Sequence, residues 1–236
     1  MNDLTLIYYS ANAILESVAQ KVRDNLLKVT ENKYPIISVT QKPINFGKNI
    51  CVGEIGKSKY NEYKQILIGA KEVKTKYIAC VEDDVLYSPE HFMYRPPADI
   101  FAYENNYWFA QIRKDFYWRV TGKMWGMLGC IVERETLIRV LSRRYELYPV
   151  YPEDSEATRY LQWGEPGFEE KCFGTDIGHI GFASENPCVM FVHESSMGYK
   201  QLLGYRRRYG TPPAEDVAFN LEQFGKLPEL WKEYWE

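Results

Sequence analysis

The first third of the chain alternates short apolar runs with amphipathic stretches, and this alternation restricts the fold more than any other feature. Residues 4–9 (LTLIYY) and 36–39 (IISV) are typical of strands, and residues 77–81 (YIACV) are typical of a strand buried on both faces. Two helical patterns separate them, one over residues 13–29 and one beginning near Ser58. This order predicts an α/β fold with a parallel sheet covered by crossover helices.

Three acids, Glu82, Asp83 and Asp84, directly follow the third of these runs. Ligands bind beyond the carboxyl ends of the strands in such a sheet. Adjacent carboxylates in a cleft are costly unless a cation compensates them, and hard ions such as Mg²⁺ or Mn²⁺ prefer carboxylate oxygens. Alternatively the acids cap the next helix, but Ser88-Pro89-Glu90 already provides a helix start. We therefore favour a metal site over a cap.

The middle of the chain is rich in aromatic residues, with ten of the 36 in residues 94–125. The runs YWFAQI and FYWRV within it predict an antiparallel hairpin. MLGCIV then predicts a strand and ETLIRVLSRRYE a helix, followed by a loop, a short helix from about Asp176 and a strand at CVMFV. No linker suggests a second domain, so we expect a single domain over residues 1–236.

Composition excludes several classes of protein. The 236 residues carry a net charge of −3, and no run approaches the roughly 18 apolar residues of a membrane span. With no signal peptide pattern either, we expect a cytoplasmic protein without a membrane or an obligate protein partner. The five cysteines are widely spaced, which is typical of reduced thiols. A zinc site of the Cys/His type is not expected, because His91, His179 and His193 lie far apart in the sequence.

The string YIACVEDDVLYSPEHF resembles the DXD segment of nucleotide-sugar glycosyltransferases of GT-A fold, in particular the family-2-like enzymes. The resemblance extends more weakly over residues 4–198, through YYSAN, MLGCIVERETL, GTDIGHIGF and FVHESS. It implies a Rossmann-like GT-A fold with a central, mostly parallel sheet and an antiparallel region on the acceptor side. It also implies a nucleotide-sugar-binding half (1–92), an acceptor and catalytic half (93–198), and a basic loop with an acidic tail (199–236).

The resemblance also implies a role for individual residues. Asp84 and His193 would bind Mn²⁺ or Mg²⁺, and Asp83 would hold the ribose or a metal-bound water. Asp176 would be the base that deprotonates the acceptor, which implies inversion at the anomeric carbon. Glu169 and Glu170 are competing bases. The alternatives are that Asp176 caps a helix and that His193 is structural.

The donor would be a nucleotide-diphosphate sugar, in particular a UDP-sugar. The other residues that the resemblance and the predicted sheet place near it are Tyr8, Ser10, Thr40, Asn61, Gln65 and Arg206. The sequence departs from the family at one point. An acid commonly ends the second strand and reads uracil, whereas Ser38-Val39-Thr40-Gln41 stands here, which leaves Thr40 or Gln41 to bond a pyrimidine.

Residues 199–209 bear on the acceptor, because they combine four basic residues with three tyrosines and no acid. Such a segment can bind a diphosphate or a nucleic-acid backbone, although a run of charge is often only a solvated helix face. The chain also resembles viral enzymes that glycosylate hydroxymethylated pyrimidines in DNA, as bacteriophages do in the host cytoplasm. We lean to that acceptor, with a glycan or a small hydroxyl compound as the alternative.

Two further classes remain open. In a non-catalytic nucleic-acid or carbohydrate binding module, the acids would be a cap and the aromatic residues a platform. A nucleotidyltransferase would favour a Gly-rich basic loop after the first strand, where Ser10-Ala11-Asn12 stands instead.

Overall fold

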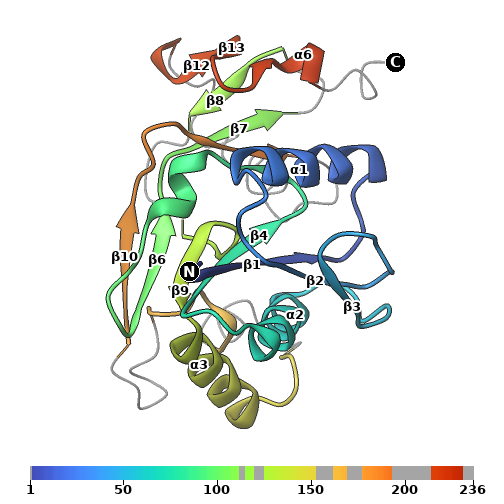
Figure 1. Ribbon diagram of the computed structural model, residues 1–236, viewed down its shortest axis with the longest axis vertical. Helices are drawn as coiled ribbons and strands as arrows, with labels where there is room; N and C mark the ends of the chain where they lie inside the picture. The colour runs from blue at the N-terminus through green and yellow to red at the C-terminus, as the bar shows by residue number, and fades with distance from the viewer. Residues whose placement is uncertain are drawn as a thin grey trace.

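The computed structural model describes residues 2–111, 115–119, 125–152, 162–168, 177–192 and 214–230. Its centre is a seven-stranded sheet with the strand order β10-β6-β9-β4-β1-β2-β3 (Figure 1). The strands in chain order are β1 (Leu4–Ser10), β2 (Ile36–Thr40), β3 (Lys48–Cys51), β4 (Tyr77–Glu82), β6 (Ile100–Glu104), β9 (Cys130–Glu133) and β10 (Gly178–Phe182).

The centre of this sheet is parallel. β1 pairs in parallel with both β2 and β4, and β2 pairs in parallel with β3. β9 is the antiparallel strand between β4 and β6. Every residue of β1 is buried, because both faces of the strand are covered. The predicted α/β fold with a mostly parallel central sheet is confirmed, and the strand order agrees with a Rossmann-like GT-A architecture.

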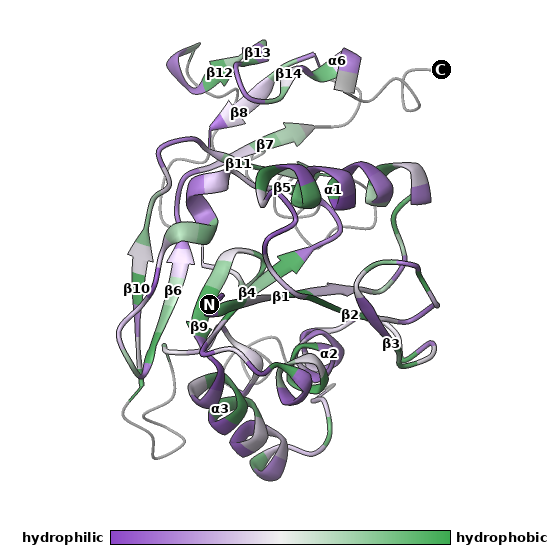
Figure 2. Ribbon diagram, in the orientation of Figure 1, coloured by the Kyte–Doolittle hydropathy of each residue, from purple (hydrophilic) through white to green (hydrophobic). Residues whose placement is uncertain are grey.

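Helices cover the two faces of the sheet unequally. α1 (Glu16–Val29) packs on one face, whereas α2 (Lys59–Glu72) and α3 (Arg134–Leu147) lie together on the other (Figure 1). Two apolar cores result, one on each face. Figure 2 shows apolar residues along β4 and mixed polar and apolar residues along α1, as expected for a buried strand and a half-buried helix.

A second, five-stranded sheet lies beside α1, with the order β12-β8-β7-β11-β5 (Figure 1). β7 and β8 form the predicted antiparallel hairpin, and β11 pairs in parallel with β7. The bounds are β5 (Val85–Leu86), β7 (Tyr107–Gln111), β8 (Tyr117–Arg119), β11 (Cys188–Val192) and β12 (Val217–Ala218). The remaining elements are 3-10 helices η1 (Pro89–Met93), η2 (Met127–Gly129) and η4 (Ala214–Asp216), strands β13 (Asn220–Leu221) and β14 (Gly225–Lys226), and α6 (Leu227–Leu230).

Three local expectations need correction. The short helix expected from about Asp176 is wrong over the described residues, because residues 178–182 form β10, whose pairing with β6 overrides the weak local pattern. No strand is expected between the runs at 36–39 and 77–81, yet residues 48–51 form the edge strand β3, which pairs with β2. The capping alternative for the three acids is also wrong. The chain turns from β4 into β5 after the acids, and the next helix, η1, begins only at Pro89.

Among the described residues, no helix has the length and apolar character needed to cross a membrane. Four cysteines are described, and all of them are free thiols. Cys80, Cys130 and Cys188 are buried and Cys51 is exposed.

Candidate functional site

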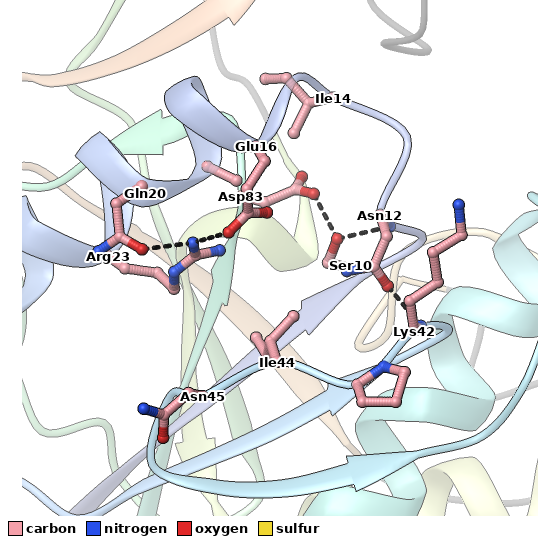
Figure 3. Close-up of a pocket in the computed structure, with 12 residues that line it drawn as sticks. Ser10, Asn12, Ile14, Glu16, Gln20, Arg23, Lys42, Ile44, Asn45 and Asp83 are labelled. Carbon is pink, nitrogen blue, oxygen red and sulfur yellow. Dashed lines mark hydrogen bonds and ion pairs between the residues drawn. The ribbon is translucent and has the colours of Figure 1, made fainter.

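A pocket of about 670 Å³ opens at the carboxyl ends of β1, β2 and β4 (Figure 3). Pockets that bind small molecules and cofactors commonly have volumes of about 300 to 1,000 Å³. Its walls come from the segment after β1, the first turns of α1, the loop after β2 and the turn after β4. The lining residues are Ser10, Asn12, Ile14, Glu16, Ala19, Gln20, Arg23, Lys42, Pro43, Ile44, Asn45 and Asp83.

Asp83 and Asp84 occupy the turn after β4. Asp83 lines the pocket and accepts a hydrogen bond from the hydroxyl of Ser10 (Figure 3). Asp84 is buried, and its backbone carbonyl accepts from the Phe191 N–H at 2.8 Å, which fixes the turn to β11. Burial and the adjacent charge of Asp83 raise the pKa of Asp84 well above its usual value. A nearby cation would reverse this effect, so the pair has the chemistry of a divalent metal site.

Glu82 points to the opposite face of the sheet from Asp83. The Tyr9 hydroxyl donates to its carboxylate at 2.5 Å, and its backbone N–H donates to the Tyr87 hydroxyl at 3.0 Å. Burial and the charge of Asp84 raise the pKa of Glu82. Consecutive acids therefore serve different faces: Asp83 opens into the pocket, and Glu82 is tied to the core beneath α2.

Arg23 forms part of the pocket wall and was not found from the sequence. It lies one residue after Val22 on the buried side of α1 and is only 3% exposed. Its guanidinium donates to Glu16 and, at 2.7 Å, to the amide oxygen of Gln20 (Figure 3). The available signal was a charged residue next to the apolar stripe of a helix, because buried arginines are rare unless they are paired.

The loops after β1 and β2 are bonded to each other across the pocket. Asn12 has a positive φ of 51°, and its amide oxygen accepts from the Lys42 N–H at 2.8 Å. The Ser10 hydroxyl oxygen accepts from the Asn12 N–H at 2.7 Å (Figure 3). Ser10 thus connects the pocket loop to Asp83, and the Lys42 side chain is placed at the rim.

Two of the predicted donor-contacting residues support these loops from behind. Thr40 is fully buried, and its hydroxyl donates to the Lys42 carbonyl at 2.6 Å. Gln65 donates to the carbonyls of Ser10 and Val39 at 2.9 and 2.7 Å, so it ties the ends of β1 and β2 together. Neither residue lines the pocket as the structure describes it, and direct contact with a nucleotide stays a prediction for both.

The structure describes some of the other predicted residues, and the rest lie outside the described part of the chain. Tyr8 lies in the core with its ring edge-on to Phe46, and Asn61 donates to the Ile55 carbonyl in the segment before α2. Gln41, the alternative reader of the base, exchanges two hydrogen bonds with the backbone of Gly56. The predicted base Asp176, the metal-binding His193 and Arg206 of the basic loop lie outside the described residues. The competing bases Glu169 and Glu170 lie outside them as well.

The described part of the site has one chemical character. Asp83 shares the pocket lining with two basic residues, Lys42 from the loop after β2 and Arg23 from α1, and Arg23 is ion-paired with Glu16. Asp84 is the buried neighbour of Asp83 in the turn. A divalent cation on the acids, with basic groups in the same pocket, suits a ligand that carries phosphate groups.

Comparison with solved structures finds chains of similar fold at low sequence identity. A nucleotidyl transferase from Methanothermobacter thermautotroptrophicus is 10% identical, with a TM-score of 0.45 over 88% of this chain and 98% of that one. A glycosyltransferase involved in glycosylation of the major capsid of PBCV-1 is 10% identical, with a TM-score of 0.46 over 87% and 100%. The glycosyltransferase GlyE from Streptococcus pneumoniae TIGR4 is 11% identical, with a TM-score of 0.42 over 99% and 60%.

No family model and no curated protein matches the chain. Similarity at this level does not extend to function, so the function has to follow from the chain's own site.

The raised pKa of Asp84 predicts how its replacement changes stability with pH. A carboxyl group whose pKa is higher in the folded state stabilises the fold at low pH, and this contribution is lost as pH rises through the folded-state pKa. Asp84→Asn removes the charge at nearly constant shape. In urea unfolding without divalent ions, its stability relative to wild type should increase as pH rises above about 4, the usual pKa of an aspartate.

Glu146→Gln is the matched control, because Glu146 forms only an exposed ion pair with Arg143 on α3. A stability difference for Asp84→Asn that stays constant over the pH range would contradict this account of the carboxylate.

Proposed function

We propose that this chain is a metal-dependent, inverting glycosyltransferase that uses a nucleotide-diphosphate sugar, most simply a UDP-sugar. One observation carries the proposal: Asp83 and Asp84 follow the buried strand β4, and Asp83 lines a pocket together with the basic residues Lys42 and Arg23. The resemblance of the segment YIACVEDDVLYSPEHF to the DXD region of GT-A enzymes supports the same activity.

The roles of the residues follow from their chemistry. Asp84 and His193 would hold Mn²⁺ or Mg²⁺, which when bound neutralises the leaving diphosphate. Asp83, oriented by the Ser10 hydroxyl, would bind the ribose or a water in the metal shell. Asp176 would take the proton from the acceptor hydroxyl on the face opposite the leaving group, which gives inversion.

Metal-dependent donor binding is the first test. Wild-type protein with Mn²⁺ should bind UDP in calorimetry and slowly release sugar from a UDP-sugar, because the carboxylates would hold the ion that neutralises the diphosphate. Chelation or Asp84→Ala should abolish both signals, whereas Glu146→Ala on the far side of the sheet should retain them. Failure of wild-type protein to bind any nucleotide diphosphate from a panel with Mn²⁺ would refute the proposed donor.

Lys42 is proposed to contact the nucleotide from the loop after β2, because the side chains of Thr40 and Gln41 form hydrogen bonds to backbone groups of the protein. A hydrogen bond to a charged group contributes about 1.5–3 kcal/mol, so Lys42→Ala should weaken UDP binding roughly 10- to 100-fold. Lys48→Ala is the control, because Lys48 pairs with Glu72 on the exposed edge strand β3. Equal affinities for the two variants would exclude Lys42 from the donor site.

For the acceptor we propose a hydroxymethylated pyrimidine in DNA, on the basis of the basic and tyrosine-rich residues 199–209. A duplex containing hydroxymethylcytosine should be retarded in a gel shift and should accept labelled sugar, with binding that weakens as salt is raised. The same duplex with unmodified cytosine is the control for transfer. Sugar transfer to glycans or small hydroxyl compounds without any transfer to the modified duplex would establish the alternative acceptor.

A further inference from the structure

Three connections lead from the central sheet to the second sheet, from β4 to β5, from β6 to β7 and from β10 to β11, and Glu104 binds the last two. Glu104 ends β6, and its carboxylate accepts from the N–H groups of Asn105 and Asn106, which lead into β7, at 3.0 and 2.8 Å. It also accepts from the Ser184 N–H at 3.1 Å, in the connection from β10 to β11. A fully buried carboxylate therefore holds the junction of the two sheets.

Glu104 remains charged in this setting. Burial by itself would raise its pKa, but the hydrogen bonds from His91 and from the backbone of Asn106 and Ser184 outweigh burial and bring the pKa below its usual value. Its one ion-pair partner among the described residues is His91, whose Nδ1 lies 3.3 Å from the carboxylate. A buried carboxylate needs a cation or full hydrogen bonding to be stable.

His91 on its own is a poor compensating cation. Its side chain is completely buried, and within the described part of the chain its Nε2 has no hydrogen-bond partner. A protonated ring would therefore carry a buried, unbonded N–H together with its charge, which is costly. A neutral ring avoids that cost but leaves the charge of Glu104 without a counterion.

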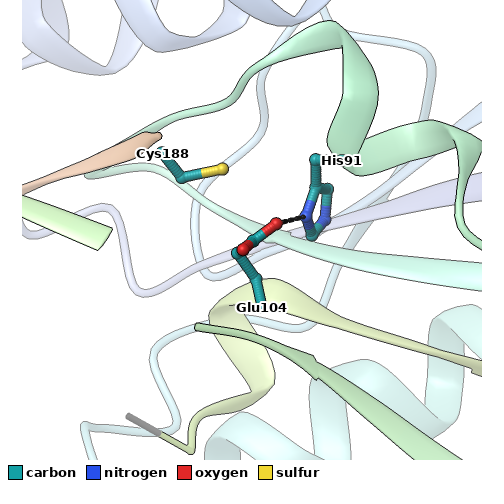
Figure 4. Close-up of side chains that lie close together, drawn as sticks. All are labelled: His91, Glu104 and Cys188. Carbon is teal, nitrogen blue, oxygen red and sulfur yellow. Dashed lines mark hydrogen bonds and ion pairs between the residues drawn. The ribbon is translucent and has the colours of Figure 1, made fainter. Parts of the chain in front are cut away.

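Cys188 supplies a third ligand atom at the same place. It begins β11 and is completely buried, and its Sγ, a nitrogen of His91 and a carboxylate oxygen of Glu104 lie within 4.8 Å of one another. Figure 4 shows the three side chains converging from η1, β6 and β11. Although these residues are far apart in the sequence, the fold brings imidazole, carboxylate and thiol groups together.

We propose that His91, Glu104 and Cys188 bind a zinc-type divalent cation that pins η1 and the two sheets to one another. Imidazole, carboxylate and thiolate are all zinc ligands, and a tetrahedral ion places such atoms about 3.3–3.6 Å apart. The His91 to Glu104 separation of 3.3 Å already meets this spacing. The three ligand atoms lie within 4.8 Å of one another, so closing the site requires the sulfur to approach by at most about 1.2 Å.

The charges also balance in this arrangement. On binding, the Cys188 thiol releases its proton to solvent and the sulfur becomes a thiolate, so that one carboxylate, one thiolate and one divalent ion sum to zero. In the protein alone, burial raises the pKa of the Cys188 thiol and keeps it neutral. The site is separate from the pocket, because none of its three residues lines the pocket. It also differs in chemistry, since Asp83 and Asp84 provide only oxygen ligands.

Cobalt is the probe, because a thiolate bound to Co²⁺ gives a charge-transfer absorption that an oxygen-only site cannot give. The full-length protein, stripped of metal and titrated with Co²⁺, should develop this absorption with one equivalent per chain, and Zn²⁺ should displace it. Cys188→Ser should lose the absorption. Cys80→Ser should keep it, because Cys80 is equally buried but lies in the core on the other face of the sheet.

Two measurements on wild-type protein do not depend on a variant that folds. X-ray absorption at the zinc edge should show one sulfur and at least two nitrogen or oxygen neighbours. Zinc at a hundredfold excess over its dissociation constant should raise the melting temperature by roughly 5–10 °C. Absence of the cobalt charge-transfer band in wild type, its persistence in Cys188→Ser, or a zinc shell without sulfur would each overturn the proposal.

Discussion

The candidate site depends on the negative charge that collects at the end of the buried strand β4. β4 is buried from Tyr77 to Val81, and its last residue, Glu82, is followed by Asp83 and Asp84. Because successive residues of a strand point to opposite faces, Glu82 and Asp83 are directed to different sides of the sheet. The neighbouring strand β1 satisfies both, through the hydroxyls of Tyr9 and Ser10. Only the pocket side is left open to a ligand, which is why the site forms there.

The same strand end determines how the pocket loops are held. Ser10 bonds Asp83 on one side and the Asn12 backbone on the other, and Asn12 in turn holds Lys42. A hydrogen-bonded path thus runs from the acids to the loop after β2. Gln65 reinforces it from α2 by bonding the ends of β1 and β2. The positions of Asp83 and of the Lys42 backbone are therefore set by the polar side chains of Ser10, Asn12 and Gln65.

Glu104 shows a second way of accommodating a buried carboxylate. At the end of β4 the acids lie together and the pKa values of Glu82 and Asp84 rise, whereas Glu104 collects backbone N–H groups from two connections and its pKa falls. The two sites therefore differ in what a cation would do. At Asp84 a cation relieves repulsion between like charges, and at Glu104 it would complete a junction that hydrogen bonds have largely built.

Local patterns were sufficient for β1, α1, β4, the hairpin of β7 and β8, and α3, because each has a periodic apolar pattern or an apolar run of its own. They failed for β10 and β3, which have no clear apolar alternation of their own and become strands through pairing at the sheet edges. Arg23 and the loop after β2 were missed for a related reason. Their place in the pocket depends on how α1 lies against the sheet, and no sequence pattern records that.

The sequence by itself determined the parallel centre of the sheet and the acids at its carboxyl edge, because hydrophobic periodicity and chain order are local properties. It did not place His91 beside Glu104 and Cys188, which are separated by 13 and 97 positions in the chain. Only the tertiary structure decided that contact, together with the pairing of the pocket loops. The first depends on the second sheet lying beside the central one, and the second on β1 and β2 being neighbours in the central sheet. Burial of apolar surface drives such packing without regard to sequence separation.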